Sequence, residues 1–129
     1  MEDGIEIVEG TVASPIYDDS RGLDSDFRVG GRVITSTITT FTNGDTTPSV
    51  SEGNIFKTAN SATTTISMFD DSVAGQEIKV IFGDNKTSID FTGTSLKGNG
   101  GTDWSPAPGD HMTCIFDGVN WYCDVSDNT

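Results

Sequence analysis

The sequence is poor in the side chains on which most catalytic and metal sites depend. Its 129 residues include one histidine, His111, and two cysteines, Cys114 and Cys123. A catalytic triad would therefore depend on His111 alone, and one chain cannot form a metal site with two histidines. The spacing of the cysteines does not match that of a zinc site. We expect a non-catalytic protein with no cofactor and no metal.

Basic residues are also few. Seven Lys and Arg stand against twenty Asp and Glu, and the formal net charge is −13. The acidic residues are spread along the chain, with eight before Val33 and twelve after it. Because nucleic-acid binding needs clustered Lys and Arg, this charge argues against a nucleic-acid partner and against anionic membrane surfaces. It indicates a soluble protein with little tendency to stick to other surfaces.

Long hydrophobic runs are missing, and the N-terminal sequence MEDGIEIVEG is acidic. We therefore expect neither a signal peptide nor membrane insertion, and a chain that functions or assembles first in a cytoplasm. Only 33% of the residues are hydrophobic. A core built from them is thin, or is completed by partner chains.

Helical periodicity is missing as well, because no stretch combines an apolar period of 3.6 residues with caps at both ends. Thr and Ser make up about a quarter of the chain, and short alternating segments are separated by turn residues. This pattern predicts an all-β protein, with an antiparallel β-sandwich, jelly roll or barrel over residues 33–129. Residues 1–32 are expected to be an irregular stalk or linker.

Alternation predicts the individual strands. The clearest is 77–82, in which Ile78, Val80 and Phe82 would face the core. The Thr-rich segment 33–42 has no strongly apolar face, which suits an edge strand or a subunit interface. Further strands are expected over residues 63–69 and 87–93, and the residues expected to share one face of 63–69 are Thr64, Ile66 and Met68.

The C-terminal segment HMTCIFDGVNWYCDV predicts a β-hairpin around Asp117-Gly118. A period of two groups the largest side chains on one face, namely Met112, Cys114, Phe116, Trp121 and Cys123. Two registers are open. A turn at Gly118-Val119 places Cys114 opposite Cys123, the only register that permits a disulfide, whereas a turn at Asp117-Gly118 places Cys114 opposite Trp121. In a reducing compartment we expect two buried thiols.

From Thr47 onward the chain resembles the C-terminal domains of bacteriophage tailspike and tail-fibre proteins. The segments that carry the resemblance are TPSVSEGNIFKT, FDDSVAGQEIKVIFGDNKTSIDF, GTSLKGNGG and PGDHMTCIFDGVNWYC. The matching residues are Pro48, Val50, Gly53, Asn54, Phe56, Thr58, Phe69, Asp70, Gly75, Gln76, Gly109, Asp110, Asp117, Gly118, Trp121 and Tyr122. The two cysteines depart from what we expect in such domains.

The resemblance implies a homotrimeric module of a viral adhesin in the virion tail, assembled in the host cytoplasm. Its expected roles are trimerisation, stability and recognition of a host surface polysaccharide or lipopolysaccharide. In tailspikes that degrade polysaccharide, the activity usually resides in a large β-helix, so a depolymerase would lie upstream or in a partner chain. The alternatives are a monomeric carbohydrate-binding module and, less favoured, an enzyme fragment that uses Asp24, Asp26 or Asp70.

Three residues are candidates for contact with a glycan: Trp104, Asp103 and Tyr122. Sugars stack on exposed aromatic rings and are held by hydrogen bonds with Asn, Asp and backbone groups. Trp104 and Asp103 lie in the Gly- and Pro-rich loop 98–110, where Trp104 is either a ligand contact or an anchor for the loop. Trp121 is expected in the core, so the adjacent Tyr122 points outward, toward a neighbouring subunit or a ligand.

Overall fold

Nearly all regular structure in the computed structural model, which describes residues 37–128, is β-strand. Three of the expectations fall outside the described residues. They are the domain boundary between residues 32 and 33, the candidates Asp24 and Asp26, and the beginning of the strand predicted over 33–42. The strands are β1 (Ile38–Thr40), β2 (Ile55–Thr58), β3 (Thr64–Ile66), β4 (Glu77–Phe82), β5 (Thr87–Ile89), β6 (Leu96–Gly98), β7 (His111–Phe116) and β8 (Trp121–Ser126). A short 3-10 helix, η2 (Asn99–Gly101), follows β6.

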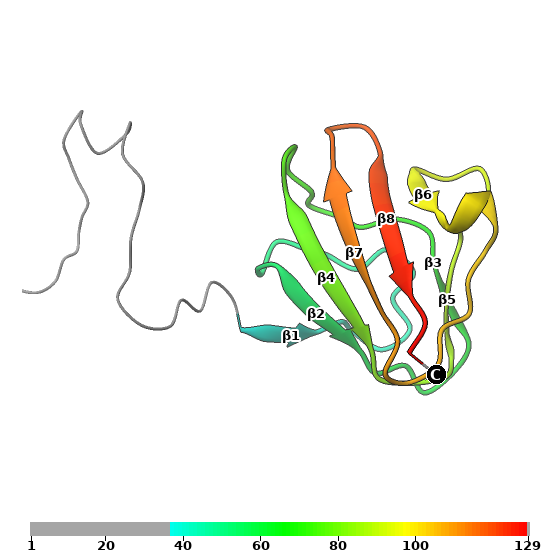
Figure 1. Ribbon diagram of the computed structural model, residues 1–129. Coiled ribbons are helices and arrows are strands. Elements are labelled where there is room, and N and C mark those ends of the chain that lie inside the picture. Colours follow the sequence, from blue (N-terminus) through cyan, green and yellow to red (C-terminus); the bar gives the residue numbers. More distant parts are fainter. Residues whose placement is uncertain (1–36, 129) are drawn as a thin grey trace, which may run out of the picture. The chain divides into compact units, whose positions relative to one another are not determined.

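The strands form two sheets, and the all-β prediction is confirmed (Figure 1). One sheet has six strands in the order β1-β2-β4-β7-β8-β6, and the other consists of β3 and β5. The expected antiparallel arrangement is correct only for the pairs β4–β7 and β7–β8. The other four pairs, β1–β2, β2–β4, β3–β5 and β6–β8, are parallel. A jelly roll is built from antiparallel strands, so these parallel pairs exclude that topology.

The parallel pairs arise because the chain winds between the two sheets in stacked coils. It runs from β2 to β3 in the second sheet, returns to β4 beside β2, and continues to β5 beside β3. Phe56 of one coil therefore lies over Val80 of the next, and Ile66 lies over Ile89. An earlier coil contributes β1 beside β2 and a parallel bridge between Ser49 and Asp70.

Polar side chains join successive coils at the corner that follows β2 and β4. The backbone N–H of Asn60 donates to Oδ2 of Asp84 at 2.8 Å, and its side-chain Nδ2 donates to Oγ1 of Thr87 at 2.8 Å. In the other direction, Oδ1 of Asn60 accepts from the N–H of Gly44 at 2.8 Å. Because Asn60 is buried, each of these bonds satisfies a group that water cannot reach.

Both sheets contribute to one apolar core. Ile78, Val80 and Phe82 of β4 are all buried, as the alternation predicts. Met68 is 45% exposed whereas Thr64 and Ile66 are buried, so the expectation that the three share one face is wrong. The reason is local: β3 ends at Ile66, so the period of two stops there and the next buried residue is Phe69. The Phe69 ring then meets Trp121 edge-on at 5.5 Å between centroids.

The hairpin of β7 and β8 adopts the first of the two predicted registers, with Cys114 opposite Cys123. Asp117 sets the turn, because its Oδ1 accepts from the N–H groups of Val119 at 2.8 Å and Asn120 at 2.7 Å. These bonds lower the pKa of Asp117 below its usual range. Gly118 has a φ of 104°, a conformation that other residues rarely adopt.

The stacking of the coils predicts different costs for two neighbouring residues of β3. Ile66→Ala removes a buried side chain that lies over Ile89, and we expect it to lower the free energy of unfolding by about 2–5 kcal/mol. Thr65→Ala alters an exposed position on the same strand, and the expected cost is below about 1 kcal/mol. Equilibrium unfolding in urea measures both, and equal losses would contradict the stacking.

The corner predicts an acid-sensitive contribution from Asp84. Burial of the Asp84 carboxyl favours its neutral form, but hydrogen bonds from Asn60, Lys86, Thr58 and Thr87 outweigh burial and lower its pKa below 3.8. The ionised group therefore stabilises the fold above pH 3.8, and this contribution is lost as the pH falls through the lowered pKa.

We expect Asp84→Asn to destabilise the protein by about 1–3 kcal/mol at pH 7 and to weaken the loss of stability in acid. The measurement is urea unfolding between pH 2 and pH 7. Glu52→Gln, at an exposed position in a turn, is the control and is expected to keep the acid dependence of the unmodified protein. An Asp84→Asn variant with an unchanged acid dependence would disprove the assignment.

Candidate functional site

Trp104 and Asp103 fasten their loop to the second sheet. Trp104 exchanges two backbone hydrogen bonds with Ile89, at 2.8 and 3.0 Å. Its half-buried ring meets Phe82 edge-on, with 5.3 Å between centroids. Oδ1 of Asp103 accepts from the N–H of Phe91 at 3.0 Å and from Oγ1 of Thr92 at 2.8 Å. Trp104 is thus an anchor for the loop. Only the part of the residue that is accessible to solvent could contact a ligand.

Tyr122 lies elsewhere, on the face of the six-stranded sheet that is turned away from the core. Its neighbours along β8, Trp121 and Cys123, are buried, and Tyr122 itself is 51% exposed. Its cross-strand partners are Ile115 of β7 and Lys97 of β6. Trp104 and Asp103 lie together because they are neighbours in the sequence. Tyr122 lies on a different part of the structure, so the three candidates do not form one site.

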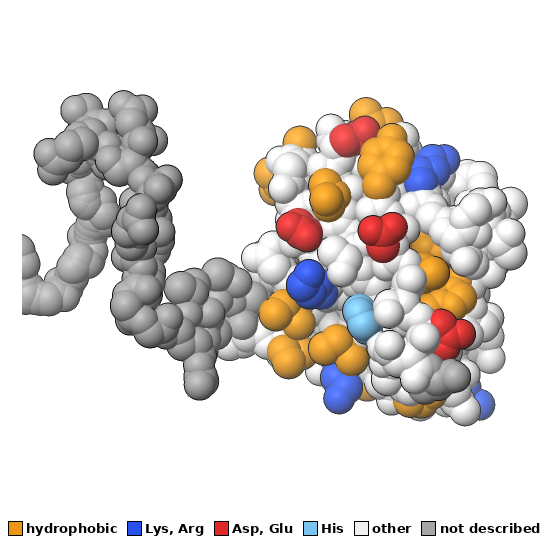
Figure 2. All heavy atoms as spheres, in the orientation of Figure 1, with side chains coloured by type: hydrophobic (Ala, Val, Ile, Leu, Met, Phe, Trp, Pro, Cys, Tyr) orange, Lys and Arg blue, Asp and Glu red, His pale blue; other side chains and the backbone are white. Residues whose placement is uncertain are grey.

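The sequence did not predict the extent of the face that carries Tyr122, and we call it the outer face. Figure 2 shows it with hydrophobic, basic and acidic side chains side by side. It consists of the outward residues of the six strands: Ile38, Thr40, Ile55, Lys57, Glu77, Lys79, Ile81, Lys97, His111, Thr113, Ile115, Tyr122, Asp124 and Ser126.

Register arranges these residues in rows across the sheet. One row runs from Ile38 through Ile55 and Lys79 to β7 and β8, and a second row contains Glu77, Ile115 and Tyr122. Apolar side chains on this face are well exposed, with Ile38 at 58% and Ile115 at 51%. A sheet face that opens to water usually carries polar residues, so these side chains mark the outer face as unusual.

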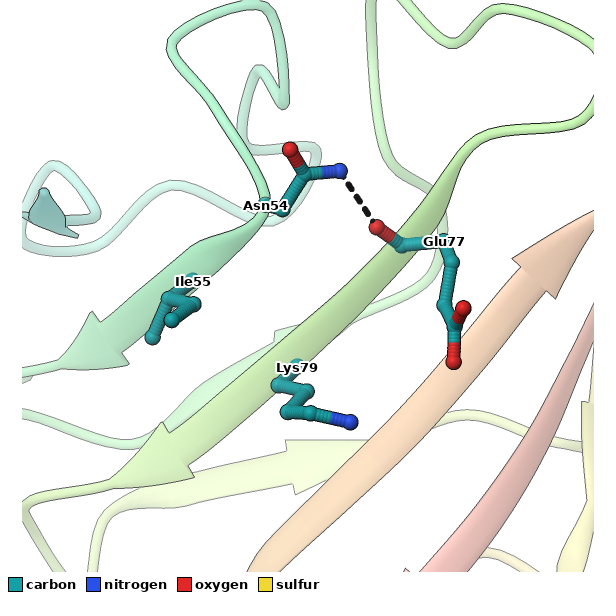
Figure 3. A pocket seen from close by; sticks show the side chains of 4 residues that line it. All are labelled: Asn54, Ile55, Glu77 and Lys79. Atoms are coloured by element: carbon teal, nitrogen blue, oxygen red, sulfur yellow. Dashed lines mark hydrogen bonds between the residues drawn. The ribbon is translucent and has the colours of Figure 1, made fainter. Parts of the chain in front are cut away.

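A shallow hollow lies on the outer face between β2 and β4 (Figure 3). It has a volume of about 250 Å³ and is lined by Asn54, Ile55, Glu77 and Lys79. Nδ2 of Asn54 donates to the backbone oxygen of Glu77 at 2.6 Å, which ties the start of β2 to β4. Beside this bonded amide and Ile55, the hollow presents the carboxylate of Glu77 and the ammonium group of Lys79, which suit contact with polar groups of a protein or a sugar. Its volume is below the roughly 300–1,000 Å³ typical of small-molecule pockets.

The remaining candidates for chemistry have structural partners. Nδ1 of His111 lies 3.0 Å from Nδ2 of Asn128, near the C-terminus. The neighbouring carboxylate of Asp110 is buried and accepts from the N–H groups of Ala107 and Asn128, each at 2.8 Å. Within residues 37–128, no three or more His, Cys, Asp and Glu side chains are grouped so that they could hold a metal ion.

Two of the residues that carry the resemblance to tailspike domains, Gln76 and Val50, also hold the fold together. Nε2 of Gln76 donates to the backbone oxygens of Val50 at 2.8 Å and Gly53 at 3.3 Å. Val50 is itself buried. This part of the sequence pattern is therefore explained by folding, and it does not by itself mark a binding site. No helix within the described part of the chain is both long and apolar enough to span a membrane.

The two thiols lie buried beside each other in the sheet. Cys114 and Cys123 are free, buried and directly opposite each other. A hydrogen bond with Cys123 and burial raise the pKa of Cys114 far above its usual range. Because the thiolate is the reactive form, the raised pKa disfavours nucleophilic and metal-binding chemistry at Cys114. The expectation of two buried thiols is confirmed.

Comparison of the chain with family models, with curated proteins and with solved structures finds no match. The likeness to tailspike and tail-fibre domains therefore depends on the sequence segments themselves. A function has to be argued from the geometry of the described residues, and above all from the outer face.

The buried pair predicts the behaviour of the thiols toward a soluble reagent. In native protein we expect reaction with Ellman's reagent to be slower than in denaturant by a factor on the order of 10³ or more, because access requires unfolding. In guanidinium chloride both thiols should react. Rapid reaction of either thiol in the native protein would show that the hairpin is not packed as described.

Proposed function

We propose that this chain is a non-catalytic module of a bacteriophage tailspike or tail fibre, that it associates as a homotrimer, and that it contributes to recognition of a host surface glycan. The observation that carries the proposal is the outer face, an exposed sheet face with apolar side chains and no covering layer among the described residues. The sequence resemblance supplies the class of protein and the trimer.

The parallel strands of the outer face support association. Sheets with parallel strands are usually covered on both sides, because connections between the strands pass over their faces. Here the connections between β1, β2 and β4 pass on the side of the second sheet, and the outer face is left open (Figure 1). Contiguous exposed apolar side chains on a small domain mark contact sites for other proteins.

The loop around Trp104 supports the glycan contact. This loop is held by backbone bonds to Ile89, and Trp104 is only partly buried. A rigid loop with an aromatic ring suits stacking on a sugar. Tyr122, the other aromatic candidate, lies on the outer face and is assigned to the contact between subunits. The proposal thus separates the two roles in space.

Native mass spectrometry and sedimentation at micromolar concentration test the trimer. The expected mass is three times that of the 13.7 kDa chain. We expect Tyr122→Ala to weaken the trimer and Trp104→Leu, which keeps an apolar contact with Phe82, to leave it intact. A monomer at these concentrations would reject the trimer.

A glycan array tests the second role. Trp104→Leu is expected to lose binding at an unchanged mass, whereas Tyr122→Ala tested at a concentration that keeps it assembled should still bind. Glycan binding by a monomer that depends on Trp104 would instead favour a monomeric carbohydrate-binding module. Release of reducing ends from a host polysaccharide, lost on replacement of Asp70, would favour an enzyme.

A further inference from the structure

Positive charge is concentrated on the outer face of an otherwise acidic domain. Residues 37–128 contain four lysines and no arginine, against twelve Asp and Glu. Three of the lysines, Lys57, Lys79 and Lys97, are exposed on the outer face, which carries only two carboxylates, Glu77 and Asp124. The outer face is thus weakly positive, while the rest of the described surface is strongly negative.

Each of these lysines stands beside apolar side chains on the neighbouring strands. Lys57 of β2 is paired with Ile81, Lys79 of β4 with Ile55, and Lys97 of β6 with Tyr122. The aliphatic stems of lysines add to the apolar area around them, while the ammonium groups remain available for carboxylates. Protein interfaces usually combine apolar side chains with a polar rim. The isoleucines and lysines of the outer face have this mixed composition.

The net charge of the chain makes this arrangement important for self-association. Two copies that each carry −13 repel one another, unless the contact brings lysines of one copy to carboxylates of the other. Contact between two outer faces would join two surfaces of the same weakly positive charge. A contact between the outer face and a different, acidic surface avoids this, and a threefold ring requires such a contact between unlike surfaces.

We infer that the outer face of one copy binds an acidic surface of the next copy, with Lys57, Lys79 and Lys97 paired with carboxylates around the isoleucines. This inference rests on the proposed trimer and says how it is held together. The main competing occupant is an anionic polysaccharide. The aliphatic character of the face favours protein, because sugars are usually held on aromatic rings and Tyr122 is the one aromatic residue here.

Charge reversal of one lysine tests the inference, with the fourth lysine as a matched control. Lys79→Glu alters the outer face, and Lys86→Glu makes the same change in an exposed turn between β4 and β5. We expect Lys79→Glu to raise the dissociation constant of the oligomer by about tenfold, and reversal of all three lysines to raise it on the order of 10²-fold. Lys86→Glu should leave it within about twofold of the unmodified protein.

Sedimentation equilibrium at 50 mM and 500 mM salt gives the readout, and circular dichroism checks that each variant folds. High salt is expected to weaken the unmodified oligomer, since it screens the lysine–carboxylate pairs. Lys79→Gln, which removes the charge without adding one, serves if Lys79→Glu does not fold.

The outcomes separate the inference from the proposed function. A rise of about tenfold in the dissociation constant on Lys79→Glu and not on Lys86→Glu supports the inference. An oligomer that tolerates reversal of all three lysines overturns it and leaves the trimer standing. A monomeric unmodified protein overturns both, and binding of an anionic polysaccharide that is lost with the lysines would then assign the face to a glycan.

Discussion

The in-register stacking of parallel coils is the constraint on which the rest of the structure depends. It places Phe56 over Val80 and Ile66 over Ile89, so that each coil covers the apolar residues of the previous one. At the corner, Asn60 and Asp84 satisfy backbone and side-chain groups that the turn would otherwise bury without partners. A slip of one residue would expose the apolar set and break these bonds together. The C-terminal residues close the stack, because β7 adds to β4 and Trp104 adds to β5, both antiparallel.

The same register creates the outer face. Because β1, β2 and β4 run in parallel, residues such as Ile38, Ile55 and Lys79 lie side by side although they are far apart in the sequence. Only 33% of the residues in the chain are hydrophobic, yet Ile38 and Ile115 are exposed on this face. Their position among the lysines of an acidic chain is the physical basis for assigning the face to another copy.

The sequence predicted what depends on neighbours along the chain and missed what depends on distant strands. The inward set Ile78, Val80 and Phe82, the hairpin, and the outward direction of Tyr122 follow from a period of two and a turn residue, and the structure confirms them. Parallel pairing was missed because alternation tells which face a residue occupies, not which strand lies beside it. The position of Met68 was predicted wrongly because alternation does not tell where a strand ends. The outer face was not predicted because its lysines come from β2, β4 and β6, which are far apart in the sequence.

The most direct test of the account is a comparison of the reactivities of the four lysines in the assembled protein. Lysine footprinting with an acetylating reagent, read by mass spectrometry, reports the access of reagent to each ammonium group. The account predicts that Lys57, Lys79 and Lys97 are protected at low salt and become reactive when the oligomer dissociates, while Lys86 reacts rapidly throughout. Equal and rapid modification of all four lysines in an intact oligomer would contradict it.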